Sequence, residues 1–190
     1  MGRIFTSFGT VSRAYNNVRS ELWRLGVLWR GSKLDGVECI YEMIDLLASV
    51  RGWMGYFDYD DKSIHFPSIY LSNPFNWVEK NSAVDVLRHE FGHALMDLYY
   101  RPLALGFLFR TAFGGPHGAK PALGSDPDDW AGRCVTPYAA TATQEDFAET
   151  FMLFVKHKGK IPARFARKPA IRKKWMAAGE IVKRVAAATR

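Results

Sequence analysis

Hydrophobic residues follow a helical spacing near the start of the chain. Between about residues 10 and 30 an apolar stripe passes through Val18, Leu22, Leu25 and Leu28. This spacing predicts an amphipathic helix. A second helix is expected from about Val37 to Val50, so residues 1–53 are expected to form N-terminal helices.

The spacing of apolar residues changes after residue 53. In "GWMGYFDYDDKSIHFPSIYL", aromatic and β-branched residues flank the turn-forming "DYDDK". We therefore expect a hairpin with strands near 54–58 and 63–66. Because Pro67 has no backbone N–H, the "SIYL" that follows is expected to be an edge strand or a loop. An edge strand here could pair with an extended peptide; alternatively, the hairpin only covers the core.

The middle of the chain contains one helical segment and one long connection. Asn81 and Ser82 offer N-cap side chains for a helix that runs to about Tyr100, and Pro102 helps to end this helix. Residues 103–140 are rich in Gly and Pro. A connection of this length predicts a lid or a binding loop.

Two more helices are expected, at about 143–156 and 168–188. Apolar residues of the last helix fall on one stripe, formed by Ile171, Trp175, Ala178, Val182 and Val185. The expected fold class is α+β, mainly helical, with a small β-hairpin or sheet. We expect a single domain, 1–190, with a core over 54–157 and a basic C-terminal helix over 158–190.

Charge is distributed unevenly along the chain. Between Lys156 and Arg190 there are 12 Lys and Arg and one acid, Glu180, whereas the rest of the chain has 14 basic and 18 acidic residues. A basic amphipathic helix can make weak contacts with acidic membranes or nucleic acids. Alternatively, the apolar stripe packs on the body of the domain and the charges stay solvated. The sequence has no specific nucleic-acid-binding motif.

Two sequence features bear on location. The chain contains no run of about 18 apolar residues, so no transmembrane segment is predicted. The start of the chain lacks the apolar region of a secretory signal. Cys39 and Cys134 are too few for a disulfide framework. These features favour a cytoplasmic protein, or one exported without a cleaved signal peptide.

A metal-binding pattern lies in the expected helix, in "VLRHEFGHALMDL", Val86–Leu98. His89 and His93 are four residues apart, so one helical face presents both imidazoles to a zinc ion at about 2.0–2.1 Å. Glu90 projects beside that ion and is suited to take a proton from water. Gly92 costs helix stability but leaves room for close packing. The motif alone is a hypothesis, and a third ligand must come from elsewhere.

Candidates for the third zinc ligand are His117, His157, Cys134, Glu145 and Glu149. In "YAATATQEDFAETF", Glu145 and Glu149 are four residues apart on a helix whose Phe residues would be buried. Buried carboxylates need partners because an unpaired buried charge is expensive. A zinc ion and its two histidines are suitable partners for these carboxylates.

The combined pattern of "HEFGHALMD" and "Y-x6-E-D-F-A-E" resembles the gluzincin metallopeptidases of the anthrax lethal factor and Pro-Pro endopeptidase group. The resemblance covers His89 to Phe154 and implies a zincin-like domain that binds Zn²⁺. The metal ligands it implies are His89, His93 and Glu145, with Glu90 as general base and Tyr138 as active-site tyrosine. Glu149 and Asp97 match supporting carboxylates, although Glu149 remains an alternative metal ligand.

These residue types suit peptide-bond hydrolysis. Zinc lowers the pKa of a bound water towards about 7 and polarises a carbonyl group. Glu90 would accept the water proton and deliver it to the leaving amine. Tyr138 would donate to the developing oxyanion, a contact worth about 3–4 kcal/mol. Glu149 and Asp97 would hold ring N–H groups of the ligand histidines.

The function expected from the resemblance is a zinc-dependent endopeptidase with a protein or peptide substrate. One alternative is a phage- or mobile-element-associated peptidase that cleaves a repressor, similar to the ImmA group. Another is a non-catalytic protein in which zinc only braces the fold and the basic tail makes the contacts. Glu90 argues against the second alternative, because a structural zinc site has no use for a base there.

Overall fold

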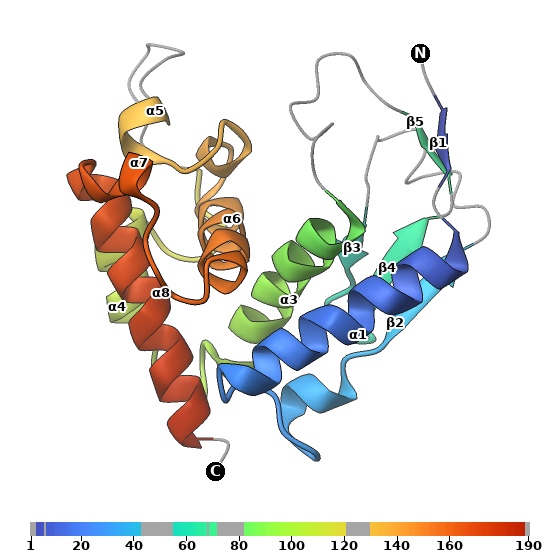
Figure 1. Cartoon of the computed structure of the whole chain (residues 1–190). Coiled ribbons are helices and arrows are strands. Elements are labelled where there is room, and N and C mark those ends of the chain that lie inside the picture. The colour runs from blue at the N-terminus through green and yellow to red at the C-terminus, as the bar shows by residue number, and fades with distance from the viewer. Residues whose placement is uncertain are drawn as a thin grey trace.

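The computed structural model describes residues 3–5, 7–42, 55–67, 69–71, 82–120 and 130–188 (Figure 1). The described helices are α1 (Phe8–Arg24), α3 (Ala83–Tyr99), α4 (Gly106–Phe113), α5 (Trp130–Arg133), α6 (Thr143–Lys156), α7 (Ala163–Ala166) and α8 (Pro169–Ala188). Short 3₁₀ helices are η1 (Lys33–Gly36) and η3 (Tyr138–Ala140). The strands are β1 (Arg3–Phe5), β2 (Cys39–Glu42), β3 (Tyr56–Phe57), β4 (Ile64–Pro67) and β5 (Ile69–Leu71). The expected mainly helical α+β class is confirmed.

Helix α3 lies at the centre of the fold. It begins at Ser82, whose side chain caps the helix by accepting from the backbone N–H of Asp85. One side of α3 packs against α1 and the other against α6 (Figure 1). A Cβ atom on Gly92 would lie 3.1 Å from Cα of Ala148 and 3.2 Å from the ring of Phe151. Gly92 therefore permits the close approach of α3 and α6 that its sequence position suggested.

Helix α6 is in turn covered by α8 (Figure 1). The stripe expected on α8 is fully buried: Ile171, Trp175, Ala178, Val182 and Val185 are all less than 6% exposed. The apolar face of this basic helix is thus part of the core. None of the described helices has the length and apolar character needed to cross a bilayer.

Two small sheets lie on the side of α3 that faces away from α6 (Figure 1). Strand β4 pairs in parallel with β2 and antiparallel with β3, with Phe57 opposite Ile64. The β3–β4 hairpin confirms the two strands expected around "DYDDK", and β3 packs on α3. Strand β5 pairs antiparallel with β1, so Ile69–Leu71 supply a strand that has one partner among the described residues.

Three element predictions are corrected by the structure. Residues Cys39–Glu42 form a strand, not the start of a helix from Val37, because they complete their hydrogen bonds with β4; residues 43–50 lie outside the described residues. The first helix ends at Arg24, before Gly26 takes a left-handed conformation with φ 76°.

The third correction concerns residues 103–140. This segment, expected to be a lid or a binding loop, contains helix α4, whose Phe109 and Phe113 side chains are buried in the core. It also contains α5 and η3, while residues 121–129 lie outside the described residues. Burial of the aromatic side chains of α4 outweighs the local Gly and Pro content that predicted a loop.

Candidate metal centre

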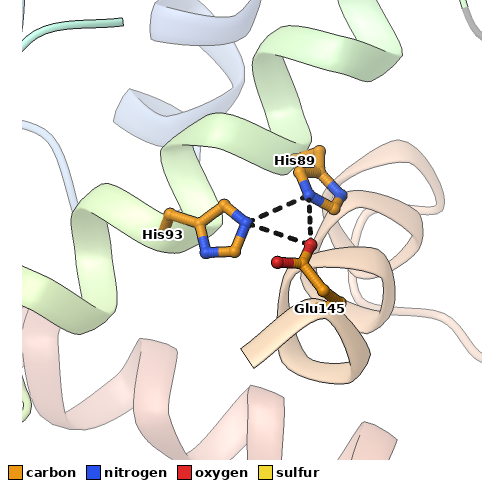
Figure 2. A group of neighbouring side chains, drawn as sticks. All are labelled: His89, His93 and Glu145. Carbon is orange, nitrogen blue, oxygen red and sulfur yellow. Dashed lines mark hydrogen bonds and ion pairs between the residues drawn. The ribbon is translucent and has the colours of Figure 1, made fainter. Parts of the chain in front are cut away.

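Three side chains from two helices converge on one point between α3 and α6 (Figure 2). His89 Nε2 lies 3.1 Å from His93 Nε2 and 3.1 Å from Oε2 of Glu145. His93 Nε2 lies 3.3 Å from the same carboxylate oxygen. Ligands about 2.0–2.1 Å from a tetrahedral zinc ion lie about 3.3–3.4 Å from one another. The donor triangle therefore has the size and the nitrogen and oxygen composition that zinc requires.

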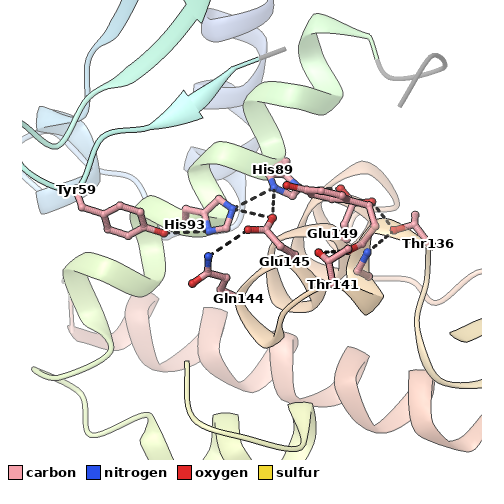
Figure 3. Close-up of polar contacts among 10 residues, drawn as sticks. Tyr59, His89, His93, Thr136, Thr141, Gln144, Glu145 and Glu149 are labelled. Carbon is pink, nitrogen blue, oxygen red and sulfur yellow. Dashed lines mark hydrogen bonds and ion pairs between the residues drawn. The ribbon is translucent and has the colours of Figure 1, made fainter. Parts of the chain in front are cut away.

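The ring of His89 is held on its far side by Glu149 (Figure 3). Its Nδ1 lies 2.7 Å from Oε1 of Glu149, while Thr136 donates to Oε2 of the same carboxylate at 2.8 Å. A carboxylate in this position accepts the Nδ1 proton and leaves the Nε2 lone pair free for a metal. Glu149 thus lies where a supporting carboxylate is expected, and Glu145 is the carboxylate in the donor triangle.

The ring of His93 has a different neighbour. Its Nδ1 lies 3.4 Å from the hydroxyl of Tyr59, at the turn of the β3–β4 hairpin (Figure 3). Asp97, expected to hold a ligand histidine, places Oδ2 2.9 Å from Nζ of Lys62 on the same hairpin. Tyr59 was not among the expected site residues. Its only sequence signal was its position within the turn "DYDDK".

Electrostatics couple the three donor side chains. Burial by itself raises the pKa of Glu145, but hydrogen bonds with His89 and His93 lower that pKa overall to well below its usual range. Burial by itself lowers the pKa of His89, but hydrogen bonds with Glu145 and Glu149 raise it overall. Negative charge therefore surrounds the imidazole nitrogens, which favours a cation at this point, either a proton or a metal ion.

Glu90 lies next to the donor triangle but outside it. Its side chain is buried, and a backbone hydrogen bond from Phe57 on β3 reaches its carboxylate. Burial raises the pKa of Glu90, and the charges of His89 and His93 oppose this shift only in part. A carboxylate with a raised pKa beside a site for a cation is suited to accept and return a proton.

Tyr138 reaches the site from η3, just before α6. Its ring centroid is 5.8 Å from that of His89, and its hydroxyl hydrogen-bonds to Glu145. Burial and the nearby carboxylates raise its pKa, so the phenol keeps its proton. With 42% of the residue exposed, Tyr138 lies at the boundary between the donor triangle and solvent.

The other candidates for the third ligand lie elsewhere. The His117 ring packs against Tyr100 and Phe109, and the His157 ring packs against Trp175. Cys134 Sγ lies 3.6 Å from the buried amine of Lys174. These three side chains therefore lie outside the donor triangle, although His117 is near enough for the charges of His93 and Glu145 to influence its pKa.

A second group of potential ligands lies on the hairpin, where Asp58, Asp61 and His65 are close together. His65 Nδ1 is 2.5 Å from Glu42 on β2, and its Nε2 is 2.8 Å from the hydroxyl of Ser63. Asp61 accepts from Ser63 and lies 3.4 Å from the His65 ring. These groups satisfy one another, so they form a polar network that fastens the hairpin to β2.

Comparison of the chain with protein-family models, curated proteins and solved structures finds no match.

Proposed function

We propose that this protein is a zinc-dependent endopeptidase of the gluzincin type. The observation that carries the proposal is the donor triangle of His89, His93 and Glu145, with a separate carboxylate beside it. A site that only braced a fold would be closed by a fourth ligand. Among the residues that the structure describes, three donors form the triangle and no fourth joins them, and Glu90 and Tyr138 flank them.

Each neighbouring side chain has a role in this proposal. Zinc, held by the three donors, would supply a Lewis acid that activates water and polarises a substrate carbonyl. Glu90 would accept a proton from the attacking water and pass it to the leaving amine. Tyr138 would donate a hydrogen bond from its hydroxyl to the carbonyl oxygen as negative charge develops there. Glu149 would keep the ring of His89 in the tautomer that binds metal.

The substitution Glu90→Gln tests the proposal. We expect the variant to keep one zinc ion per chain, because Glu90 lies outside the donor triangle, and to lose cleavage by about 10²–10⁴-fold. The measurements are elemental analysis and identification of new termini in a protein mixture treated with each variant. Glu38→Gln, which changes an exposed glutamate, is the matched control. Normal cleavage by Glu90→Gln, or a purified protein that binds no zinc, would contradict the proposal.

The same experiment, with chelation of the metal added, separates the alternatives. A non-catalytic protein braced by zinc would unfold when the metal is chelated, and neither variant would generate new termini. A repressor-cleaving peptidase would keep the dependence on Glu90 but cut a single partner and leave most proteins intact. Cleavage activity therefore distinguishes the endopeptidase from the non-catalytic protein, and the range of substrates distinguishes it from the repressor-cleaving peptidase.

A further inference from the structure

A concave site lies at the far end of α6 from the candidate metal centre. Its volume is about 1440 Å³, and its walls come from the end of α1, from α4, from α8 and from the turn after α6. Glu145 lies in the first turn of α6 and Phe154, which lines the groove, in its last turn. At 1.5 Å per residue the two ends are about 13 Å apart along the helix. We call this site the α4–α8 groove.

The floor of the α4–α8 groove is apolar. The half-buried Leu108 and Ala112 of α4 line it, and the buried side chains of Phe154, Trp175 and Val182 lie beneath. Met176 of α8 also lines the groove, and 66% of this residue is exposed. An apolar floor with an exposed methionine favours contact with hydrophobic side chains.

The rim of the groove is strongly basic. Its cationic residues come from four segments: Arg24, Lys158, Arg167, Arg172, Lys173 and Lys183. One acid lines the groove, Glu180, and its carboxylate is already paired with Arg184 at 3.0 Å. The six cations form no ion pair with any residue in the described part of the chain. The groove therefore carries uncompensated positive charge around an apolar surface.

Size and charge together select the occupant. Sites for small molecules typically have volumes of about 300–1,000 Å³, so this groove is large for a single small anion. A helix that binds in a groove buries an apolar face and leaves its polar face towards the rim. We propose that the α4–α8 groove binds an acidic amphipathic helical segment of another protein. This inference rests on the groove alone and does not depend on the proposed peptidase activity.

The test uses a synthetic peptide of about 16 residues with leucines on one helical face and glutamates on the other. A scrambled peptide of the same composition, which cannot form the apolar face, is the peptide control. Binding to the whole protein is measured by calorimetry and by fluorescence anisotropy at two salt concentrations. Vesicles containing anionic lipid are measured in parallel, because a basic face can also bind a membrane.

Two variants of the groove are compared with one matched control. The double substitution Arg172→Glu with Lys173→Glu reverses two rim charges near the start of α8, where acidic residues are favoured by the helix dipole. Met176→Asp places a charge on the apolar floor. Arg13→Glu with Arg101→Glu changes the net charge by the same amount at exposed positions away from the groove. Thermal unfolding checks that all variants remain folded.

We expect the amphipathic peptide to bind and each groove variant to weaken binding at least tenfold, with no more than twofold change in the control. Higher salt should weaken the peptide's binding to the unmodified protein. The proposal is overturned if the scrambled peptide binds equally well, or if the control pair weakens binding as much as the groove variants do. It is also overturned if anionic vesicles bind while the peptide does not.

Discussion

The carboxylate of Glu149 joins the hydroxyl of Thr136 to the ring of His89. One oxygen lies 2.7 Å from His89 Nδ1, and the other accepts from Thr136 at 2.8 Å. Thr136 itself accepts a hydrogen bond from the backbone N–H of Ala139, at 3.1 Å. The loop before α6 therefore fixes the carboxylate, and the carboxylate fixes the imidazole.

Glu149→Gln is expected to lower zinc affinity by about 10–100-fold, because a neutral amide accepts the Nδ1 proton less strongly than a carboxylate does. Competition with a chelator measures the affinity. Thr136→Val, which removes one support of the carboxylate, should give a smaller loss. Unchanged affinity in Glu149→Gln would show that the ring needs no support from this carboxylate.

Tyr138→Phe is expected to leave zinc affinity unchanged and to lower kcat by about 10²–10³-fold, the usual effect of removing one oxyanion donor. Tyr59→Phe removes a hydroxyl of the same kind, 3.4 Å from His93 Nδ1, and should change zinc affinity more than kcat. Steady-state kinetics and metal analysis of both variants separate these effects. Equal kcat in Tyr138→Phe and the unmodified protein would exclude the role given to Tyr138.

Gly92→Ala is expected to destabilise the fold by about 1–3 kcal/mol through overpacking, although alanine is the better helix former by about 1 kcal/mol. The added Cβ would press on Ala148 and Phe151, where α3 and α6 meet. Urea unfolding measures the change. Gly132→Ala is the control, because no atom of the described residues lies within 4 Å of a Cβ there. A stable Gly92→Ala variant would mean that the two helices separate at little cost.

Lys174→Met is expected to destabilise the protein by about 3–5 kcal/mol, because it leaves the buried carboxylate of Asp146 without its ion-pair partner. The pKa of Asp146 is raised to about 6, because burial raises it by more than the charge of Lys174 lowers it. Replacing both residues, with Lys174→Met and Asp146→Leu, should recover most of the loss. Denaturant unfolding of the two variants decides this; equal stability of the single and double variants would contradict the expectation.

The hairpin network predicts a dependence of stability on pH. Burial by itself lowers the pKa of His65, but bonds with Glu42 and Asp61 raise it overall. Because the folded pKa is raised, this stabilisation is complete below the unfolded value of about 6.5 and is lost as pH rises through the folded pKa. Thermal unfolding between about pH 6 and 8 should show this loss, and His65→Gln should remove it. The same pH slope in both proteins would exclude His65 as its source.

Local patterns determined much of the chemistry of this protein. Positions i and i+4 share a helical face, so the spacing of His89 and His93 was enough to predict that both imidazoles point the same way. The same rule applied to Glu145 and Glu149 on the helix at 143–156, whose limits agree with α6. The apolar stripe of α8 was equally readable, because its burial follows from helical periodicity.

Contacts between segments distant in sequence were decided by the tertiary structure. Cys39–Glu42 form a strand because β4 lies beside them, and the aromatic residues of α4 form a helix on the core in a segment rich in Gly and Pro. The fold also placed Tyr59 beside His93 and Asp97 beside Lys62. Helical periodicity fixes which residues share a face, so the sequence by itself determined the donor types and their faces. It does not fix which distant segment meets that face, so packing alone brought Glu145 into the triangle and surrounded the α4–α8 groove with charge.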